Sequence, residues 1–518
     1  MRWMSARWAG TAILAATALS APLAAQEAKQ RELVQIMGET IDVRVINVEA
    51  VVTGHSGQRV RGLAAGDFRL LVDGREVPVE YFAEVADGAS VTAETPGKAP
   101  ATAAPVPAGE AVGRSYLVYV DDSFSLVSRR NAVLDKLERD LSLLRPADKM
   151  AVLAFDGFRI AVLSRWTGDA RLLKAALEQA RQRPAHGDRA LAQQRALKHD
   201  EEAVIDAELE GDQTRAALSD LSNRISPEAR TQLGRTATAA AAALRGFESP
   251  PGRKVMMLLS GAWSLSVAPQ LYGPMVNAAN RLGYTVYPVD AAMSDAREVT
   301  VLDKLARATG GRVMVSPTNE VFKDMVADSS SYYWLGFTPS WKANDKGHKV
   351  TVEVRRPELT VRSRDGFTDP SKKTETAMKA ESVLMFGGTA DDRRLIVKLG
   401  EPRRQGRDFE VPVTLGVPVE ALALTPQGKG YLAEIPLSIA TLDGDGGRAD
   451  LPASHLKVAV TTLPRTGTYA RFQTVVRLRQ AGQRLVFTVP DPVSGQALWG
   501  QADFQLQSVA TLGKGGKR

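Results

Sequence analysis

Short apolar runs alternate with amphipathic stretches through the middle of the chain. Residues 116–120 are all apolar or aromatic, which is typical of a strand buried in a parallel sheet. In the stretch that follows, apolar residues recur at helical spacing from Val133 to Leu144. The alternation continues to about residue 315 and predicts a doubly wound sheet. The expected strands are 116–120, 150–155, 160–164, 255–259, 285–289 and 312–315, and the expected helices are 130–144, 169–181, 272–282 and 302–309.

Strand-like runs flank this region on both sides. Residues 41–85 contain several such runs and the turn pair Asp73-Gly74, and residues 331–367 return to the same character. Because neither stretch has enough strands to be stable alone, we expect the two to pair as one β unit. A third β-rich stretch, 395–506, has turn residues between its runs and predicts a sandwich of immunoglobulin-like type.

The remaining stretches set the expected domain boundaries. Residues 188–245 are Ala-rich and charged without a strand-like run, so we expect a helical insertion, either a solvated arm or a partner-binding arm. Within it, Ser226-Pro227-Glu228 predicts a helix start. The expected parts are a signal peptide (1–25), an N-terminal β segment (26–85), a linker (86–112), an α/β domain (113–330), a β segment that pairs with the first (331–368), a linker (369–394) and a C-terminal β-sandwich (395–518).

The first residues predict export. Arg2 and Arg7 precede a small apolar stretch at 9–21, and Leu23-Ala24-Ala25 forms a small-residue cleavage site before Gln26. The apolar stretch is short for a membrane span, although a retained anchor is the alternative. We therefore expect a mature protein in the periplasm or at the cell surface, with no membrane span after the signal is removed.

Composition narrows the classes of function. The net charge of +7 is mild for 518 residues, and basic residues form no block beyond the tail at 514–518, so nucleic-acid binding is not expected. The absence of cysteine excludes thiol catalysis and thiolate metal sites. The sequence contains no HExxH, GxSxG or P-loop motif, and its five histidines show no ligand spacing. We therefore expect a protein that is not an enzyme.

Oxygen-bearing side chains follow the expected strand at 116–120. Asp121, Ser123 and Ser125 have the spacing D-x-S-x-S. Ligands of open α/β sheets bind at the carboxyl ends of the strands, and carboxylate and hydroxyl oxygens suit Mg²⁺. These three residues are therefore candidate metal ligands. The alternative is a strand-to-helix turn in which the same side chains cap the helix.

The D-x-S-x-S stretch resembles the metal-ion-dependent adhesion motif of von Willebrand factor A domains. Further segments, before and after this stretch, occur in the order found in exported bacterial VWFA-related proteins. Residues 41–367 therefore resemble that family. The resemblance implies an α/β, Rossmann-like von Willebrand A domain with a helical insertion, flanked by β-rich domains, and it implies binding of a partner protein. The matching segments are VINVEAVVTGHSGQRVRGLAAGDFRLLVDGREV, PPGRKVMMLLSG, ANRLGYTVYPVDA, ATGGRVMV, YYWLGFTPSW and RSRDGF.

The metal motif departs from the family pattern at two places. The loop at 184–188 lacks the threonine of a complete site, and Leu259-Ser260-Gly261-Ala262 lacks the aspartate. Asp188 and Ser264 are the available substitutes. We therefore expect weak Mg²⁺ binding, completed by a carboxylate of a partner protein. The alternatives are a metal-free structural scaffold and an envelope hydrolase that uses Asp121 or Asp122.

Overall fold

The computed structural model describes most of the chain from residue 45 to residue 505. Contacts divide it into two compact units, of which the first is Asp42–Ser371 and the second contains the described residues from Lys372 onward. The described residues are 45–94, 109–189, 227–247, 249–261, 271–291, 301–314, 320–386, 395–419, 424–443, 448–465, 467–490 and 497–505, with the single positions 192, 213, 216 and 422.

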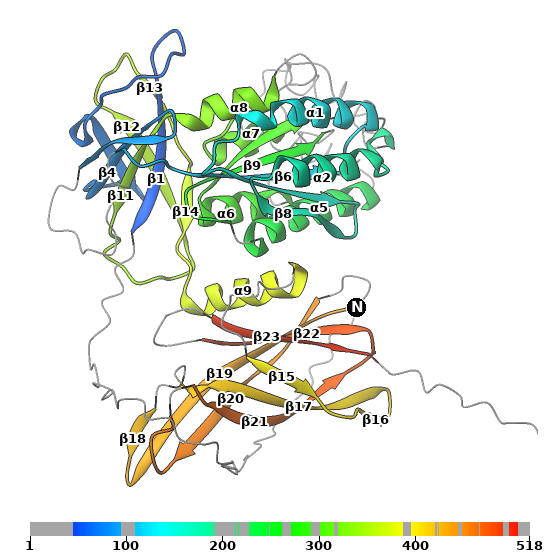
Figure 1. The fold of residues 1–518 in the computed structure, drawn as a ribbon. Helices are drawn as coiled ribbons and strands as arrows, with labels where there is room; N and C mark the ends of the chain where they lie inside the picture. Colours follow the sequence, from blue (N-terminus) through cyan, green and yellow to red (C-terminus); the bar gives the residue numbers. More distant parts are fainter. Residues whose placement is uncertain are drawn as a thin grey trace, which may run out of the picture. The chain divides into compact units, whose positions relative to one another are not determined.

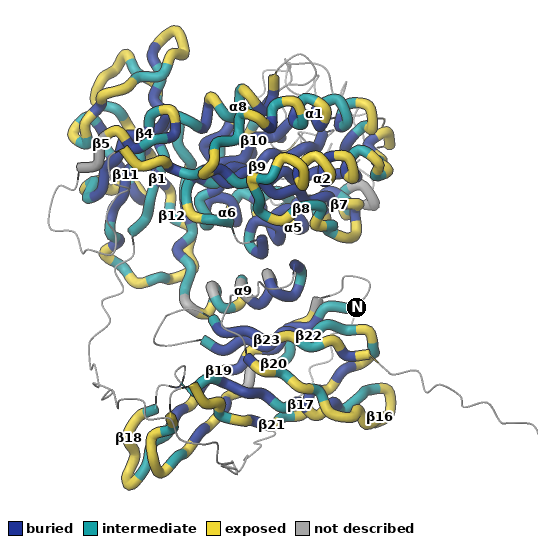
Figure 2. The backbone as a smooth tube through the Cα atoms, viewed as in Figure 1, coloured by how far each residue is buried: buried dark blue, intermediate teal, exposed yellow. Residues whose placement is uncertain are grey.

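A five-stranded sheet lies at the centre of the first unit, with strand order β10-β9-β6-β7-β8. Neighbouring strands are parallel except at the edge, where β8 runs antiparallel to β7. All eight residues of β6 are buried, which explains the continuous apolar run in its sequence. Figure 2 shows that β9 and β10 are also largely buried. The strands are β6 (Arg114–Asp121), β7 (Lys149–Phe155), β8 (Ile160–Thr167), β9 (Arg253–Ser260) and β10 (Tyr284–Asp290).

Amphipathic helices pack against this sheet (Figure 1). In the first helix, Val133, Leu134 and Leu137 form one apolar face and join the core with residues of β6. That helix starts three residues earlier than the sequence predicts, and a short 3₁₀ turn replaces its expected last residues. The helices are α1 (Val127–Arg139), η2 (Asp140–Leu143), α2 (Ala170–Gln182), α5 (Pro227–Gly246), α6 (Gly273–Leu282), α7 (Val301–Ala308) and α8 (Val321–Ser330).

Strands from both ends of the first unit pair in two antiparallel sheets, as the sequence leads us to expect. Strand β1 pairs with β11, and β2 pairs with β12. Their shared core includes Val48, Phe68, Phe82 and Tyr333. The sheet orders are β13-β1-β11-β4-β5 and β14-β12-β2-β3. The elements are β1 (Ile46–Thr53), η1 (Ala65–Asp67), β2 (Phe68–Val72), β3 (Arg75–Val77), β4 (Tyr81–Ala86), β5 (Ala89–Glu94), β11 (Tyr332–Phe337), β12 (Gly347–Val354), β13 (Thr360–Arg362) and β14 (Gly366–Thr368).

Among the described residues, the second unit contains two antiparallel sheets and one helix. The sheets share one apolar core, which is the arrangement of a β-sandwich. Helix α9 packs Ala380, Val383 and Leu384 against Val486 and Trp499. The elements are α9 (Lys372–Phe386), β15 (Ile396–Leu399), β16 (Arg403–Gln405), β17 (Asp408–Pro418), β18 (Thr425–Gln427), β19 (Gly430–Leu442), β20 (Arg448–Val460), β21 (Tyr469–Leu478), β22 (Gln483–Pro490) and β23 (Ala497–Phe504).

The predicted fold class is wrong for the chain. The sequence predicts an α/β protein with a Rossmann-like von Willebrand A domain, whereas four of the five sheets among the described residues contain only antiparallel pairs. The βα alternation is confined to one sheet. The flanking stretches supply strands that pair antiparallel, which needs no crossover helix. The described chain is therefore predominantly antiparallel β structure.

Both expected linkers contain regular structure. Helix α9 lies within 369–394. The mostly polar sequence of this stretch favours a linker, but Ala380, Val383 and Leu384 form an apolar face of the helix. Strand β5 lies within 86–112 and pairs with β4. In the expected insertion, 188–245, helix α5 starts at Pro227, as Ser226-Pro227-Glu228 predicts. The expected signal peptide, 1–25, and most of 190–226 lie outside the described residues.

One buried carboxylate joins the antiparallel sheets to the parallel sheet. Asp328 of α8 accepts hydrogen bonds from Arg59, which follows β1, from Arg362 of β13 and from the hydroxyl of Tyr287 in β10, each at 2.6 Å. Its side chain is only 7% exposed. Although burial alone would raise the pKa of this carboxyl, the Arg362 and Arg59 guanidinium groups hold it well below its usual range.

We expect Asp328→Asn to destabilise the first unit by about 3 kcal/mol, because removing one partner of a buried ion pair leaves the others uncompensated. Scanning calorimetry of the full chain measures the effect. Asp303→Asn is the control, since it breaks a surface pair in which Arg307 is 76% exposed and Asp303 is 25% exposed, and it should cost at most about 1 kcal/mol. Equal effects of the two variants would contradict this role of Asp328.

The lowered pKa of Asp328 also predicts how the effect of this variant on stability depends on pH. A carboxyl whose folded pKa lies below its unfolded value of about 3.9 stabilises the fold above that pH, and this contribution is lost as the pH falls. The difference in stability between wild type and Asp328→Asn should therefore be full at neutral pH and shrink below about pH 4. A difference that stays constant down to strongly acid pH would show that the ionised carboxylate is not what stabilises the unit.

Candidate functional site

The candidate site lies at the carboxyl ends of the parallel strands. Strand β6 ends at Asp121, which is in register with Phe155, the last residue of β7. The backbone N–H of Asp122 donates to the carbonyl of Phe155 at 2.9 Å, so β7 also fixes the start of the following loop. Strand β9 ends beside β6 at Ser260. Three neighbouring strands therefore end at one edge of the sheet, and two of them, β6 and β9, end there in a polar residue.

Asp121 is fully buried, and both of its carboxylate oxygens are bonded. Oδ1 accepts from the backbone N–H of Ser123 at 3.0 Å, and Oδ2 accepts from the hydroxyl of Ser260 at 2.6 Å. Burial raises the pKa of Asp121 to about 7, and the bond from Ser260 opposes the rise. Ser260 belongs to the stretch Leu259-Ser260-Gly261-Ala262, where the resemblance implies an aspartate. The pairing of β6 with β9 is what reveals its role.

The two serines of the motif also bond within the protein. Ser123 Oγ accepts from the side chain of Gln232 in α5 at 3.1 Å, and Ser125 Oγ lies 3.5 Å from the carbonyl of Leu259. The loop at 183–188 packs tightly here, because a Cβ added to Gly187 would lie 2.6 Å from the backbone of Ser125. The structure thus brings the three predicted ligand residues to one edge, with Ser125 fully buried and Ser123 nearly so.

Asp122 holds helices α1 and α2 in place through ion pairs with two arginines. Its carboxylate accepts from Arg130 Nη1 at 2.7 Å and from Arg183 Nε at 2.6 Å. Arg130, itself fully buried, also donates to the carbonyls of Arg181 and Arg183. Asp122 thereby ties α1 and the end of α2 to the edge. An acid held by two guanidinium groups is poorly suited to act as a general base or nucleophile.

The residues at this edge do not fit a hydrated Mg²⁺ ion. Mg²⁺ requires octahedral oxygen coordination and keeps several waters, whereas Asp121 and Ser125 are fully buried and every candidate ligand already has a partner within the protein. No cluster of three acids or histidines suited to a metal occurs among the described residues. Asp188 is exposed, and Ser264 lies outside the described residues.

An exposed aromatic ring stands next to this edge. Phe158, in the turn between β7 and β8, is 71% exposed. The Arg235 guanidinium lies over its ring at 5.1 Å from the centroid. A Cβ added to the preceding Gly157 would lie 3.0 Å from Ser123 Oγ, so this turn touches the motif loop. Val127, the first residue of α1, adds a second exposed apolar side chain at the edge. Phe158 is not among the candidates from the sequence, although an aromatic residue after Asp156-Gly157 in a hairpin turn is a detectable signal.

Two of the segments that resemble the VWFA-related family also contain Tyr332, Tyr333 and Asp290. Tyr332 and Tyr333 are buried. Asp290 ends β10 and is in register with Ser260. None of the helices in the described ranges combines the length and apolar character needed to cross a membrane.

We expect calorimetric titration of the mature protein with Mg²⁺ or Mn²⁺ at millimolar concentration to show no binding, because Ser260 occupies an oxygen of Asp121. Ser260→Ala frees that oxygen and is the variant in which weak binding could appear. Asp121→Asn, which keeps the side-chain volume, is the control. Binding by the wild type that Asp121→Asn abolishes would contradict this interpretation and restore the site expected from the sequence.

Comparisons with known proteins name no family for the chain. No family model matches it, and no curated protein matches it. Among solved structures, it is similar to the pilus adhesin SpaC of Lactobacillus rhamnosus GG, with 7% sequence identity and a TM-score of 0.24. The similarity covers 75% of this chain and 56% of the adhesin chain, so it spans little more than half of that protein. A TM-score this low carries no argument about fold or function.

Proposed function

We propose that this chain is an exported, non-enzymatic module that binds a partner protein through the loops at the carboxyl ends of β6 and β7, without a metal ion. The observation that carries the proposal is the exposed ring of Phe158 beside an edge whose acids are bonded internally. Aromatic residues and arginine are enriched at protein interfaces. The contact between Arg235 and Phe158 restricts the ring before binding, which lowers the entropy lost when a partner binds.

The bonding of the two acids supports binding rather than chemistry. Asp121 bonds to Ser260 and to the backbone of Ser123, and Asp122 pairs with two arginines. A hydrolase would need a base within reach of a nucleophile and of substrate. These two acids, the residues that a hydrolase would use according to the sequence, support the loop instead.

Export and family are parts of the proposal that rest on sequence. Arg2, Arg7 and the apolar stretch 9–21 support a signal peptide. The order of motifs in residues 41–367 supports a relationship to the exported VWFA-related proteins. A module of this kind would act in the periplasm or at the cell surface, where partner proteins of the envelope are available.

A photo-crosslinking amino acid in place of Phe158 tests the binding surface. We expect it to capture a discrete protein from intact cells, because the ring lies at the centre of the proposed contact. The matched control is Leu172 of α2, which is also apolar and 57% exposed. Because β8 runs antiparallel to β7, it ends at the opposite edge of the sheet, just before α2 starts. Equal capture at positions 158 and 172, or capture at neither, would contradict the proposal.

N-terminal sequencing of the protein purified from its native cells tests export. We expect the mature chain to start at or near Gln26, because the small residues Leu23-Ala24-Ala25 precede it. Subcellular fractionation should place the processed chain outside the cytoplasm. A cytoplasmic protein that retains Met1 would refute this part of the proposal.

A further inference from the structure

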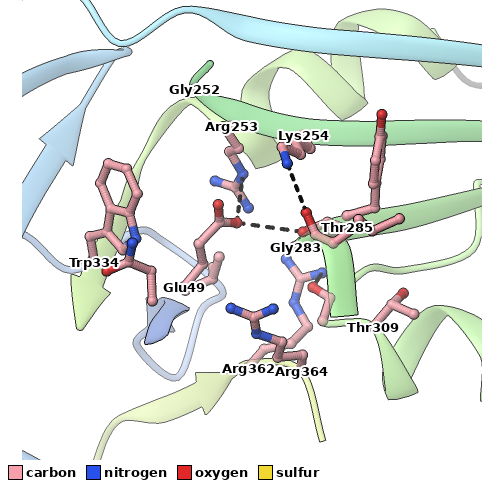
Figure 3. Close-up of a pocket in the computed structure, with 15 residues that line it drawn as sticks. Glu49, Gly252, Arg253, Lys254, Gly283, Thr285, Thr309, Trp334, Arg362 and Arg364 are labelled. Atoms are coloured by element: carbon pink, nitrogen blue, oxygen red, sulfur yellow. Dashed lines mark hydrogen bonds and ion pairs between the residues drawn. The ribbon is translucent and has the colours of Figure 1, made fainter. Parts of the chain in front are cut away.

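A cavity of about 160 Å³ lies at the other end of the same parallel strands. It is bordered by the first residues of β9 and β10, by β1 and β11, and by the chain after β13 (Figure 3). Its volume is several times the roughly 30 Å³ that one water molecule occupies in the liquid. The cavity therefore has room for a small organic molecule.

Four cationic side chains and one acid line this cavity, namely Arg253, Lys254, Arg362, Arg364 and Glu49. Figure 3 shows that they come from opposite sides and surround the hollow. The lining thus carries a formal excess of positive charge. Such an excess in a partly enclosed space attracts anions.

Two of the arginines have acidic partners. Arg253 lies with its Nε 3.1 Å from Glu49 and stacks over the ring of Tyr332 at 4.1 Å. Arg362 pairs with Asp328 at 2.6 Å. Their charges are therefore largely balanced inside the protein. Both still present their side chains to the cavity.

Unlike Arg253 and Arg362, Arg364 has no ion pair among the residues that the structure describes. Its Nη1 donates to the backbone carbonyl of Asn280 at 2.8 Å, and Glu49 acts on it only through its longer-range field. Burial lowers the pKa of Arg364, which means that its charge is poorly compensated where it lies. A bound anion would supply the missing negative charge.

Part of the lining is apolar. Trp334 of β11 lies on one side of the cavity. Val51, Leu282 and Tyr284 also contribute to the lining. A flat group could pack against the indole, as aromatic rings do in protein interiors. We propose that this cavity binds a small organic oxyanion, a carboxylate or phosphate monoester carried on a flat apolar group. The site is independent of the proposed partner-binding edge, because it lies at the amino ends of the strands.

Isothermal titration of the full mature chain with three probes tests the proposal. Benzoate and phenyl phosphate carry the two oxyanions on the same ring, and benzamide is the neutral analogue of benzoate. We expect saturable binding of at least one of the two anions and none of benzamide. Saturable binding of neither anion, or benzamide binding as tightly as benzoate, would overturn the proposal.

Variants locate the binding. Arg364→Met should weaken anion binding about tenfold or more, since it removes a charge-assisted contact. Arg307→Gln is the control, because it removes an exposed arginine that does not line the cavity, and it should leave the affinity unchanged. Glu49→Gln removes the competing carboxylate and should tighten binding, so it keeps the test decisive if Arg364→Met fails to fold. Wild-type affinity in both Arg364→Met and Glu49→Gln would place the binding elsewhere.

Discussion

The carboxylate of Asp328 is the contact on which the arrangement of the first unit depends. It lies on a helix that packs on the parallel sheet, yet two of its partners, Arg59 and Arg362, come from the antiparallel part. The third, Tyr287, comes from the parallel sheet itself. Hydrophobic packing alone is not directional, whereas three hydrogen bonds to one buried carboxylate fix how the sheets meet. The residues that donate these bonds are far apart in the sequence.

The first unit has two features with different chemistry, which lie at opposite ends of the parallel strands. At the carboxyl ends, the buried acids are bonded within the protein, and the ring of Phe158 is exposed. At the amino ends, the junction with the antiparallel sheets leaves a cavity in which Arg364 pairs with no acid of the described ranges. The first feature suits the side chains of a partner protein, and the second suits a small anion.

Much of the local structure could be predicted from the sequence, because buried strands and amphipathic helices leave periodic patterns. Strand β2, Phe68–Val72, lies in the stretch 41–85 where the sequence predicts strands, and the following pair Asp73-Gly74 makes the expected turn, with both residues at positive φ. Pairing between the distant β segments could also be expected, because neither could form a stable sheet alone. The fold class was mispredicted because one regular βα region outweighed the less regular strands on either side of it.

The contacts of the candidate sites could not be predicted in the same way. Asp328 is one of two acids in helix α8, and nothing in the local sequence indicates that it, rather than Asp324, is buried beside distant arginines. The sequence indicates Asp121, Ser123 and Ser125, but it does not show that Ser260 and Gln232 bond to them. Those contacts depend on strand register and on the position of α5, which are set by long-range packing.

The central claim is that the loops around Phe158 bind a partner protein without a metal ion. The most direct measurement compares recovery of the partner by the full mature chain in EDTA and in Mg²⁺, for wild type and Phe158→Ala. The account predicts equal recovery by the wild type in both conditions and a loss of recovery by Phe158→Ala. Recovery that disappears in EDTA, returns with Mg²⁺ and is unaffected by Phe158→Ala would contradict it.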